Sequence, residues 1–149
     1  MKLTNFEITS LIVLESDGLI WDVHNVFHFE ELVLRCEDNS ALMRWSAPFS
    51  GIPFGDETRD AAGMELLFGD LKFLQIGPRD AELPLKEDRC VASVIKVESK
   101  SVEPNPWFRT RKIWGDSDEF RVFFDFQSAR TIEIESATVE LCPLKKNKN

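Results

Sequence analysis

Hydrophobic and polar residues alternate most regularly near the end of the chain, in residues 119–142 (EFRVFFDFQSARTIEIESATVELC). A period of 2 is typical of a strand with one face in the core and one in water. Short polar breaks divide the stretch into three runs, which predicts an antiparallel meander. The residues expected to line the core are Phe120, Val122, Phe124, Ile132, Ile134, Val139 and Leu141.

The first third of the chain shows the same period with interruptions at turn-forming residues. Its predicted elements are a strand over 6–15, a turn at 16–18, an extended or irregular stretch over 19–30, and strands over 31–37 and 41–46 joined by a turn at 38–40. In the second of these hairpin strands, Met43 and Trp45 are expected to face the core.

The middle of the chain combines two long loops with a predicted hairpin. The loops cover residues 47–63 and 77–89, and both contain proline. Between them, Gly69-Asp70 is a two-residue turn signal, so Met64–Phe68 and Leu71–Ile76 are predicted to pair as a hairpin. The segment DETRDAAGMELLF (56–68) also allows a short helix capped by Asp56.

The last predicted elements are a strand over 90–98, an irregular stretch over 99–107, a hairpin of 107–114 with 119–126, and a frayed tail over 145–149. With roughly nine or ten short strands and no long helical period, the sequence predicts an all-β, single β-rich domain over residues 1–149. An antiparallel β-sandwich and a partly open barrel with long loops both satisfy this pattern.

The charge of the chain is acidic and unevenly distributed. The net charge is -8, and residues 1–75 hold 5 Lys and Arg against 13 Asp and Glu, whereas residues 76–149 hold 13 of each kind. An acidic first half disfavours nucleic acid and anionic membranes as partners. It is compatible with a basic protein partner, or with solubility alone.

The cysteines and the chain start favour a cytoplasmic protein. Cys36, Cys90 and Cys142 are sparse, odd in number and without a CxxC pair, which argues against a disulfide framework. Cys36 and Cys90 lie in apolar strand patterns and are expected to be buried thiols. The first residues lack a convincing signal peptide, and no apolar run is long enough for a membrane helix.

The two histidines, His24 and His28, have the HxxxH spacing that zinc sites place on one helical face. Their segment alternates like a strand instead, with Asp22, His24, His28 and Glu30 on one face and Trp21, Val23, Phe27 and Phe29 on the other. A solvated face, a ligand or partner site and a metal site remain open, and we predict no metal requirement.

Sequence motifs offer little support for catalysis. There is no GxSxG, HExxH, GxGxxG or phosphate loop, so no cofactor is expected and an enzyme is disfavoured. Carboxylates such as Glu65, Glu82, Glu87 and Asp88 form an acid–base pair only if the fold brings two of them together in a cleft.

Two charged segments are candidate binding regions. In WFRTRKIW (107–114), Trp107, Arg109 and Arg111 suit an anionic ligand, although edge-strand charges that prevent sheet pairing explain the same pattern. In GPRDAELPLKED (77–88), Arg79, Asp80, Glu87 and Asp88 suit either partner recognition or local ion pairs, with Arg89, that order the loop.

If 64–76 is a hairpin, the two long loops leave the domain at the same end. That end would present a mixed aromatic and acidic surface suited to a partner, formed by Phe49, Phe54, Asp56, Glu57, Arg79, Asp80, Glu87 and Asp88. The alternative is that Phe49 and Phe54 fold back and belong to the core.

The segments HNVFHFEELVLRC, MELLFGDLKFLQI and RTIEIESATVEL, within residues 24–142, resemble small bacterial β-rich proteins of unknown function, including immunity proteins that neutralise polymorphic toxins. The resemblance implies an accessory, non-catalytic role and assigns no functional residue. We therefore expect a protein-interaction module, and an immunity-type inhibitor is one form that it could take. The alternatives are a small-molecule-binding protein or hydrolase with a site in the mouth of the β scaffold, and a structural subunit.

Overall fold

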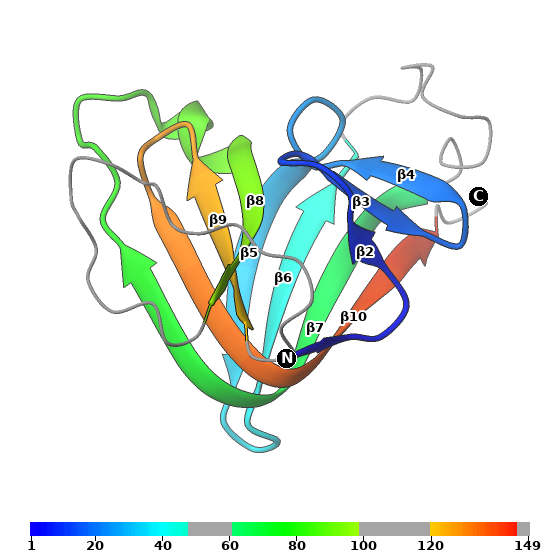
Figure 1. Ribbon diagram of the computed structural model, residues 1–149. Coiled ribbons are helices and arrows are strands. Elements are labelled where there is room, and N and C mark those ends of the chain that lie inside the picture. Colours follow the sequence, from blue (N-terminus) through cyan, green and yellow to red (C-terminus); the bar gives the residue numbers. More distant parts are fainter. Residues whose placement is uncertain (48–60, 99–119, 146–149) are drawn as a thin grey trace.

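The computed structural model describes residues 1–47, 61–98 and 120–145. These residues form strands and one 3₁₀ turn, without an α-helix, so the predicted all-β class is confirmed. One sheet curls into a half-barrel, and a small second sheet lies beside it (Figure 1). Of the two arrangements that the sequence allowed, the molecule has the partly open barrel.

The large sheet has the strand order β5-β6-β7-β10-β9-β8, with β1 paired to β10, and the small sheet has the order β2-β3-β4. The strands are β1 (Lys2–Leu3), β2 (Glu7–Ile8), β3 (Val13–Ser16), β4 (Leu19–Asp22), β5 (His28–Arg35), β6 (Ser40–Ser46), β7 (Ala61–Gly77), β8 (Val91–Glu98), β9 (Phe120–Phe126) and β10 (Thr131–Lys145), and the 3₁₀ turn η2 covers Leu85–Arg89. All neighbours pair antiparallel except β1 and β10, which are parallel.

Two long strands, β7 and β10, pair along their whole length and form the spine of the curled sheet. Figure 1 shows both strands bending together at the base of the half-barrel. At this bend the register shifts by one residue between Glu135 and Ser136, and Asp70 takes a left-handed φ of 53°. A bulge of this kind bends the strand and increases its twist without ending the ladder.

The hairpin predicted across Gly69-Asp70 is therefore wrong, and so is the predicted break between the second and third runs of the meander. Both signals mark the same feature, because Thr138 pairs with Gly69 and Ser136 with Leu71. The turn-forming residues bend two strands that continue to pair, instead of reversing either of them. The sequence offers no local sign of this choice, since it depends on a partner strand about 65 residues away.

The core lies inside the half-barrel and is rich in aromatic side chains. Trp45 packs near Phe29 and Phe124, with ring centroids 5.4 and 5.8 Å away. The small sheet contributes Leu14 and Trp21 to the same cluster. All seven predicted core residues of β9 and β10 are buried, as are Met43 and Trp45, which confirms the predicted register of these strands.

Several shorter predictions also need correction. The predicted strand over 6–15 is split into β2 and β3, because the carbonyl of Val13 accepts hydrogen bonds from the amides of Thr9 and Ser10 and closes a turn. The described part of the predicted helix, residues 61–68, belongs to β7, where Met64, Leu66 and Phe68 are buried with a strand period. Residues 107–119 of the last predicted hairpin lie outside the described residues.

The cysteines depart from the expected burial. Cys36 lies in the turn between β5 and β6 and is exposed, whereas Cys90 and Cys142 are only partly buried. Cys36 was placed in the strand pattern, but β5 ends one residue earlier, at Arg35. Partial burial raises the pKa of the Cys90 and Cys142 thiols above the ordinary value and so disfavours their thiolate forms.

Replacing Phe124 with Ala should lower the free energy of unfolding by about 3–5 kcal/mol, because the side chain is fully buried against Trp45. Urea unfolding of the two proteins measures this difference. Ile76→Ala is the matched control, since Ile76 lies on the adjacent part of the sheet and is 54% exposed. A loss as small at Phe124 as at Ile76 would contradict the described core.

Candidate functional site

A cleft of about 410 Å³ opens beside the N-terminal segment. It lies where the chain passes from β1 into the small sheet, next to the turn between β3 and β4. Its lining residues are Leu3, Thr4, Asn5, Phe6, Glu7, Glu15, Asp17 and Gly18. Three of them carry carboxylates and none is basic, so the cleft is acidic.

Hydrogen bonds fix the walls of the cleft to the large sheet. The side-chain amide of Asn5 donates to the carbonyl of Leu141 (2.8 Å) and accepts from the Leu141 amide (2.9 Å). Asn5 thus imitates a backbone pair and continues the ladder that β1 begins on β10. The Thr4 amide also donates to the Val139 carbonyl at 2.9 Å. One wall of the cleft is therefore held in place by β10.

The opposite wall is the turn between β3 and β4. Asp17 and Gly18 both have positive φ, 51° and 76°, as a tight two-residue hairpin turn requires. The buried Ser16 hydroxyl donates to the Asn5 carbonyl at 2.8 Å and joins the two walls. The cleft is thus preformed, because both of its walls are tied to each other and to the sheet.

The carboxylates of the cleft are placed against one another. Glu7 pairs directly opposite Glu15 in the β2–β3 ladder, and Asp17 follows in the adjoining turn. Like charges directly opposite each other destabilise a sheet. No ion pair joins these three side chains to any residue in the described part of the chain. A cation entering the cleft would relieve this repulsion.

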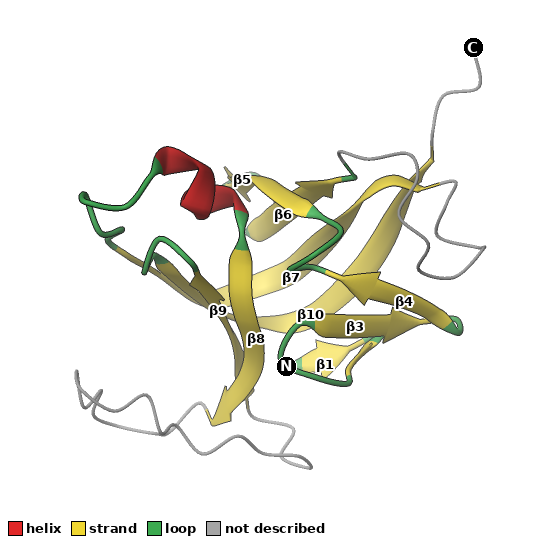
Figure 2. Ribbon diagram, turned by 90° about the horizontal axis from the view of Figure 1, so that it is seen from above, coloured by secondary structure: helices red, strands yellow, loops and turns green. Residues whose placement is uncertain are grey.

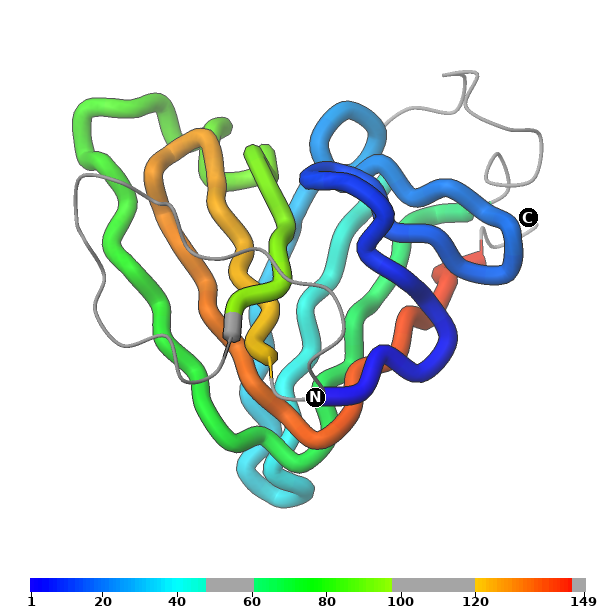
Figure 3. Tube along the Cα trace, in the orientation of Figure 1, coloured from blue at the N-terminus to red at the C-terminus, as the bar shows by residue number. Residues whose placement is uncertain are grey.

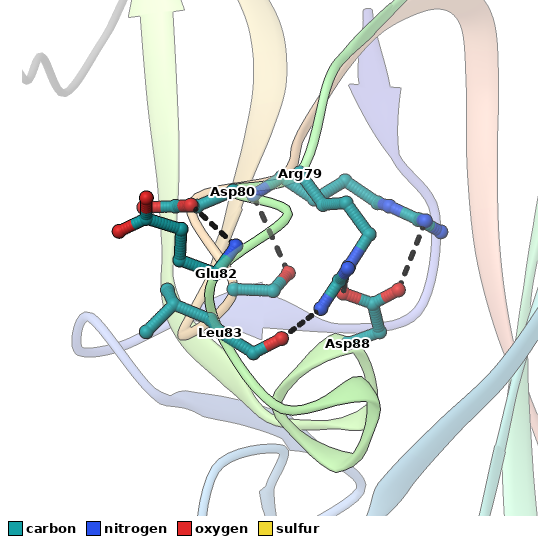
Figure 4. A network of polar contacts seen from close by, with 7 residues as sticks. Arg79, Asp80, Glu82, Leu83 and Asp88 are labelled. Carbon is teal, nitrogen blue, oxygen red and sulfur yellow. Dashed lines mark hydrogen bonds and ion pairs between the residues drawn. The ribbon is translucent and has the colours of Figure 1, made fainter.

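The loop predicted to recognise a partner is ordered by its own charges. Arg79 donates from Nε to Asp88 (3.0 Å) and also to the carbonyl of Leu83, and Arg130 reaches the second oxygen of Asp88 at 3.0 Å (Figure 4). Asp80 accepts a hydrogen bond from the Glu82 amide at 2.9 Å. Ion pairs that order the loop, the second interpretation offered by the sequence, thus account for Arg79 and Asp88.

The same loop also contacts β5. Arg89, at the end of η2, forms an ion pair with Glu30, which also accepts a hydrogen bond from Ser46. Figure 2 shows η2 lying between β8 and β5, the two end strands of the large sheet. Glu87 is half-buried in this turn, whereas Asp80 is exposed.

The docking surface that the sequence predicted loses its geometric basis. Because β7 is one continuous strand, Ala61 and Gly77 lie at its opposite ends, and the hairpin on which the prediction was based does not form. Figure 3 follows this strand from one end of the half-barrel to the other. Phe49, Phe54, Asp56 and Glu57 lie outside the described residues, as do Trp107, Arg109 and Arg111 of the alternative ligand site.

His24 and His28 are separated by a turn and do not share one strand. Asp22 caps this turn by accepting hydrogen bonds from the amides of His24 (3.0 Å) and Asn25 (2.8 Å). The His24 ring contacts the Val91 carbonyl at 2.7 Å and attaches the turn to β8, while His28 begins β5. The strand predicted to carry Trp21, Val23, Phe27 and Phe29 on one face is thus interrupted by the turn, although all four side chains are buried. Within the described ranges, no three His, Cys, Asp or Glu side chains gather as metal ligands.

The outer face of the curled sheet carries two clusters, each with one arginine between two glutamates. Arg44 bonds to Glu31 at 2.5 Å and to Glu65 at 2.7 Å across β5, β6 and β7. Arg121 bonds to Glu135 at 2.8 Å and to Glu133 at 3.2 Å, and its guanidinium stacks on Phe73. Glu65, one of the carboxylates considered for an acid–base pair, thus forms an ion pair with Arg44 on the outer face.

Sequence reasoning identified the turn at Ser16-Asp17-Gly18 and the acidic first half, but it missed the cleft. The decisive contact joins Asn5 to Leu141, 136 residues apart, and no local pattern announces it. The one feature of the cleft that the sequence could have indicated is that Glu7 and Glu15 lie opposite each other across a short turn. The prediction of a single strand over 6–15 excluded that turn.

Comparison with protein-family models, with curated proteins and with solved structures gives no match to this chain. Among the described residues, no helix has the length and apolar character needed to cross a membrane.

Asp88→Asn should destabilise the protein by about 1–3 kcal/mol at neutral pH, because it removes the charge that Arg79 and Arg130 share. Burial favours a higher pKa for Asp88, but its hydrogen bonds and the two arginines together lower the pKa below the ordinary value. The charged form therefore stabilises the fold above an unfolded pKa of about 3.9, and this contribution is lost as the pH falls through the folded pKa.

Urea unfolding at a series of pH values tests this assignment. The difference between the wild type and Asp88→Asn should be largest above about pH 4 and shrink in more acidic solution. Glu82→Gln is the control, because only the backbone amide of Glu82 is engaged in this loop. A pH-independent difference would contradict a stabilising role for the Asp88 charge.

Proposed function

We propose that this protein is a non-catalytic interaction module that binds a basic segment of a protein partner, with the acidic N-terminal cleft as the binding site. The observation that carries the proposal is the cleft itself, which is preformed, holds three carboxylates and has no basic lining residue. The cleft combines a cavity with three carboxylates that form no ion pair with a described residue.

A lysine or arginine side chain matches the chemistry of the cleft. Its charged end would lie between Glu7, Glu15 and Asp17, where carboxylates accept charge-assisted hydrogen bonds. Its aliphatic stem would lie along Leu3 and Phe6, since long basic side chains cover apolar surface with their methylene groups. Arginine has the advantage of a planar fork that binds two carboxylate oxygens at once.

The charge of the whole chain supports the same partner class. With a net charge of -8, the protein attracts a basic partner from a distance and speeds encounter, while the cleft provides the specific contact. The resemblance to immunity proteins supports an inhibitor that occupies a toxin surface, which is an accessory role without chemistry of its own.

A small organic cation is the second candidate ligand. The cleft volume, about 410 Å³, lies within the range of small-molecule sites. Its lining is mostly polar, however, whereas such sites are mostly apolar with a few polar groups. This difference favours a side chain presented by a protein.

Titration with the peptide acetyl-Arg-Gly-Arg-Gly-Arg-amide, followed by amide NMR shifts, tests the proposal. We expect saturable shifts at Thr4–Glu7 and Glu15–Gly18, and none with the peptide in which glutamine replaces arginine. The variant Glu7→Gln/Glu15→Gln should weaken peptide binding by about tenfold, which corresponds to about 1.4 kcal/mol. If arginine amide alone binds as tightly as the peptide, the result favours a small organic cation as the ligand.

The control variant is Glu37→Gln/Glu82→Gln, which removes the same charge at two exposed positions outside the cleft. It should bind the arginine peptide as the wild type does. If both double variants weaken binding equally, the attraction comes from the net charge alone and the cleft is not the site.

A further inference from the structure

The strand β5 forms one edge of the large sheet, and its outer edge is divided into two parts. The first part is covered, because η2 lies beside it and Arg89 pairs with Glu30. A register shift between Phe29 and Glu31 also interrupts the ladder there. The second part, Glu31–Arg35, pairs regularly with β6 and has no strand beside its outer edge in the described part of the chain.

This second part of β5 is held rigidly and projects from the body. Figure 1 shows the β5–β6 hairpin reaching beyond the bend of β7 and β10. In its turn, the Asn39 carbonyl accepts the Leu71 amide at 2.8 Å and the Asn39 side chain donates to the Leu71 carbonyl at 3.0 Å. Leu34 is 52% exposed in this position, and Arg35 is exposed. A fixed, regular edge strand is a template for another strand.

The sequence of this edge, Glu31-Leu32-Val33-Leu34-Arg35, is complementary to itself. When two copies lie antiparallel with Val33 opposite Val33, Leu32 of each copy faces Leu34 of the other, and Glu31 faces Arg35. Opposite charges and apolar side chains are then matched at every position of the pairing. Opposite charges placed directly across a ladder stabilise the pairing of two strands.

We propose that the protein forms a two-fold symmetric dimer through antiparallel pairing of Glu31–Arg35 with a second copy of the same strand. The occupant is a second copy because charge complementarity is satisfied by the strand itself, and an isologous contact closes after two subunits. Arg35 has no ion pair with the described residues, and Glu31 can bond to Arg35 of the partner while keeping Arg44. This interface is separate from the acidic cleft.

A disulfide placed on the two-fold axis tests the register. In Val33→Cys/Cys36→Ser, the two introduced cysteines face each other, at the separation of directly opposed strand residues. Added oxidised glutathione should take up the two electrons and convert the protein to a covalent dimer on non-reducing gels. The control is Glu140→Cys/Cys36→Ser, whose cysteine is exposed on the interior strand β10 and should remain monomeric.

Sedimentation equilibrium up to millimolar concentration tests the interface without a covalent link. The wild type should dimerise, and Arg35→Glu should raise the dissociation constant by at least about tenfold, because it places glutamate opposite Glu31 twice in the dimer. Lys72→Glu makes the same change of charge at an exposed position on β7 and should dimerise normally. A wild type that is monomeric throughout, or cysteine variants that cross-link at equal rates, would overturn the proposal.

Discussion

The pairing of β7 with β10 is the interaction on which the other features of the fold depend. These two strands run through both halves of the half-barrel, so every other strand of the large sheet is attached, directly or through one neighbour, to one of them. Their shared bend adds to the ordinary twist of the sheet and curls it into a concave surface. Ser136 is buried at this bend, where its hydroxyl donates to the Thr138 carbonyl at 2.7 Å and satisfies the distorted backbone.

The curvature explains the composition of the core and of the outer face. The concave side is filled by large aromatics such as Trp45, Phe124 and Phe126, whose size suits the wide interior. On the convex side, Arg44 pairs with one glutamate on each neighbouring strand, and Arg121 pairs with two glutamates of β10. Five described arginines form ion pairs within the fold, whereas Glu7, Glu15 and Asp17 at the cleft have no such partner among the described residues.

The alternation of residues predicted the fold class and the inward face of β9 and β10, because both follow from the side-chain period of single strands. It failed where two strands interact. Gly69-Asp70 and Ser136 carry turn propensity, but whether such residues reverse a strand or bend it depends on the partner strand that they face. The cleft escaped prediction for a similar reason, since Asn5 acquires its role only from Leu141 at the far end of the chain. The sequence thus indicated local interactions, such as the ion pairs around Asp88, but it did not indicate which distant segments pair as strands.

The central position of β10 has a consequence for the order of events in folding. β10 lies between β7 and β9 and also supports β1, yet it is the last strand to be synthesised in the described part of the chain. During synthesis, the hairpin of β5 and β6, extended by β7, can form only local contacts. Its apolar face stays exposed to solvent until β10 has left the ribosome. Contacts of such long sequence separation form slowly, and exposed strand edges favour aggregation in the meantime. The nascent chain should therefore need its longest protection from chaperones just before residues 131–145 emerge.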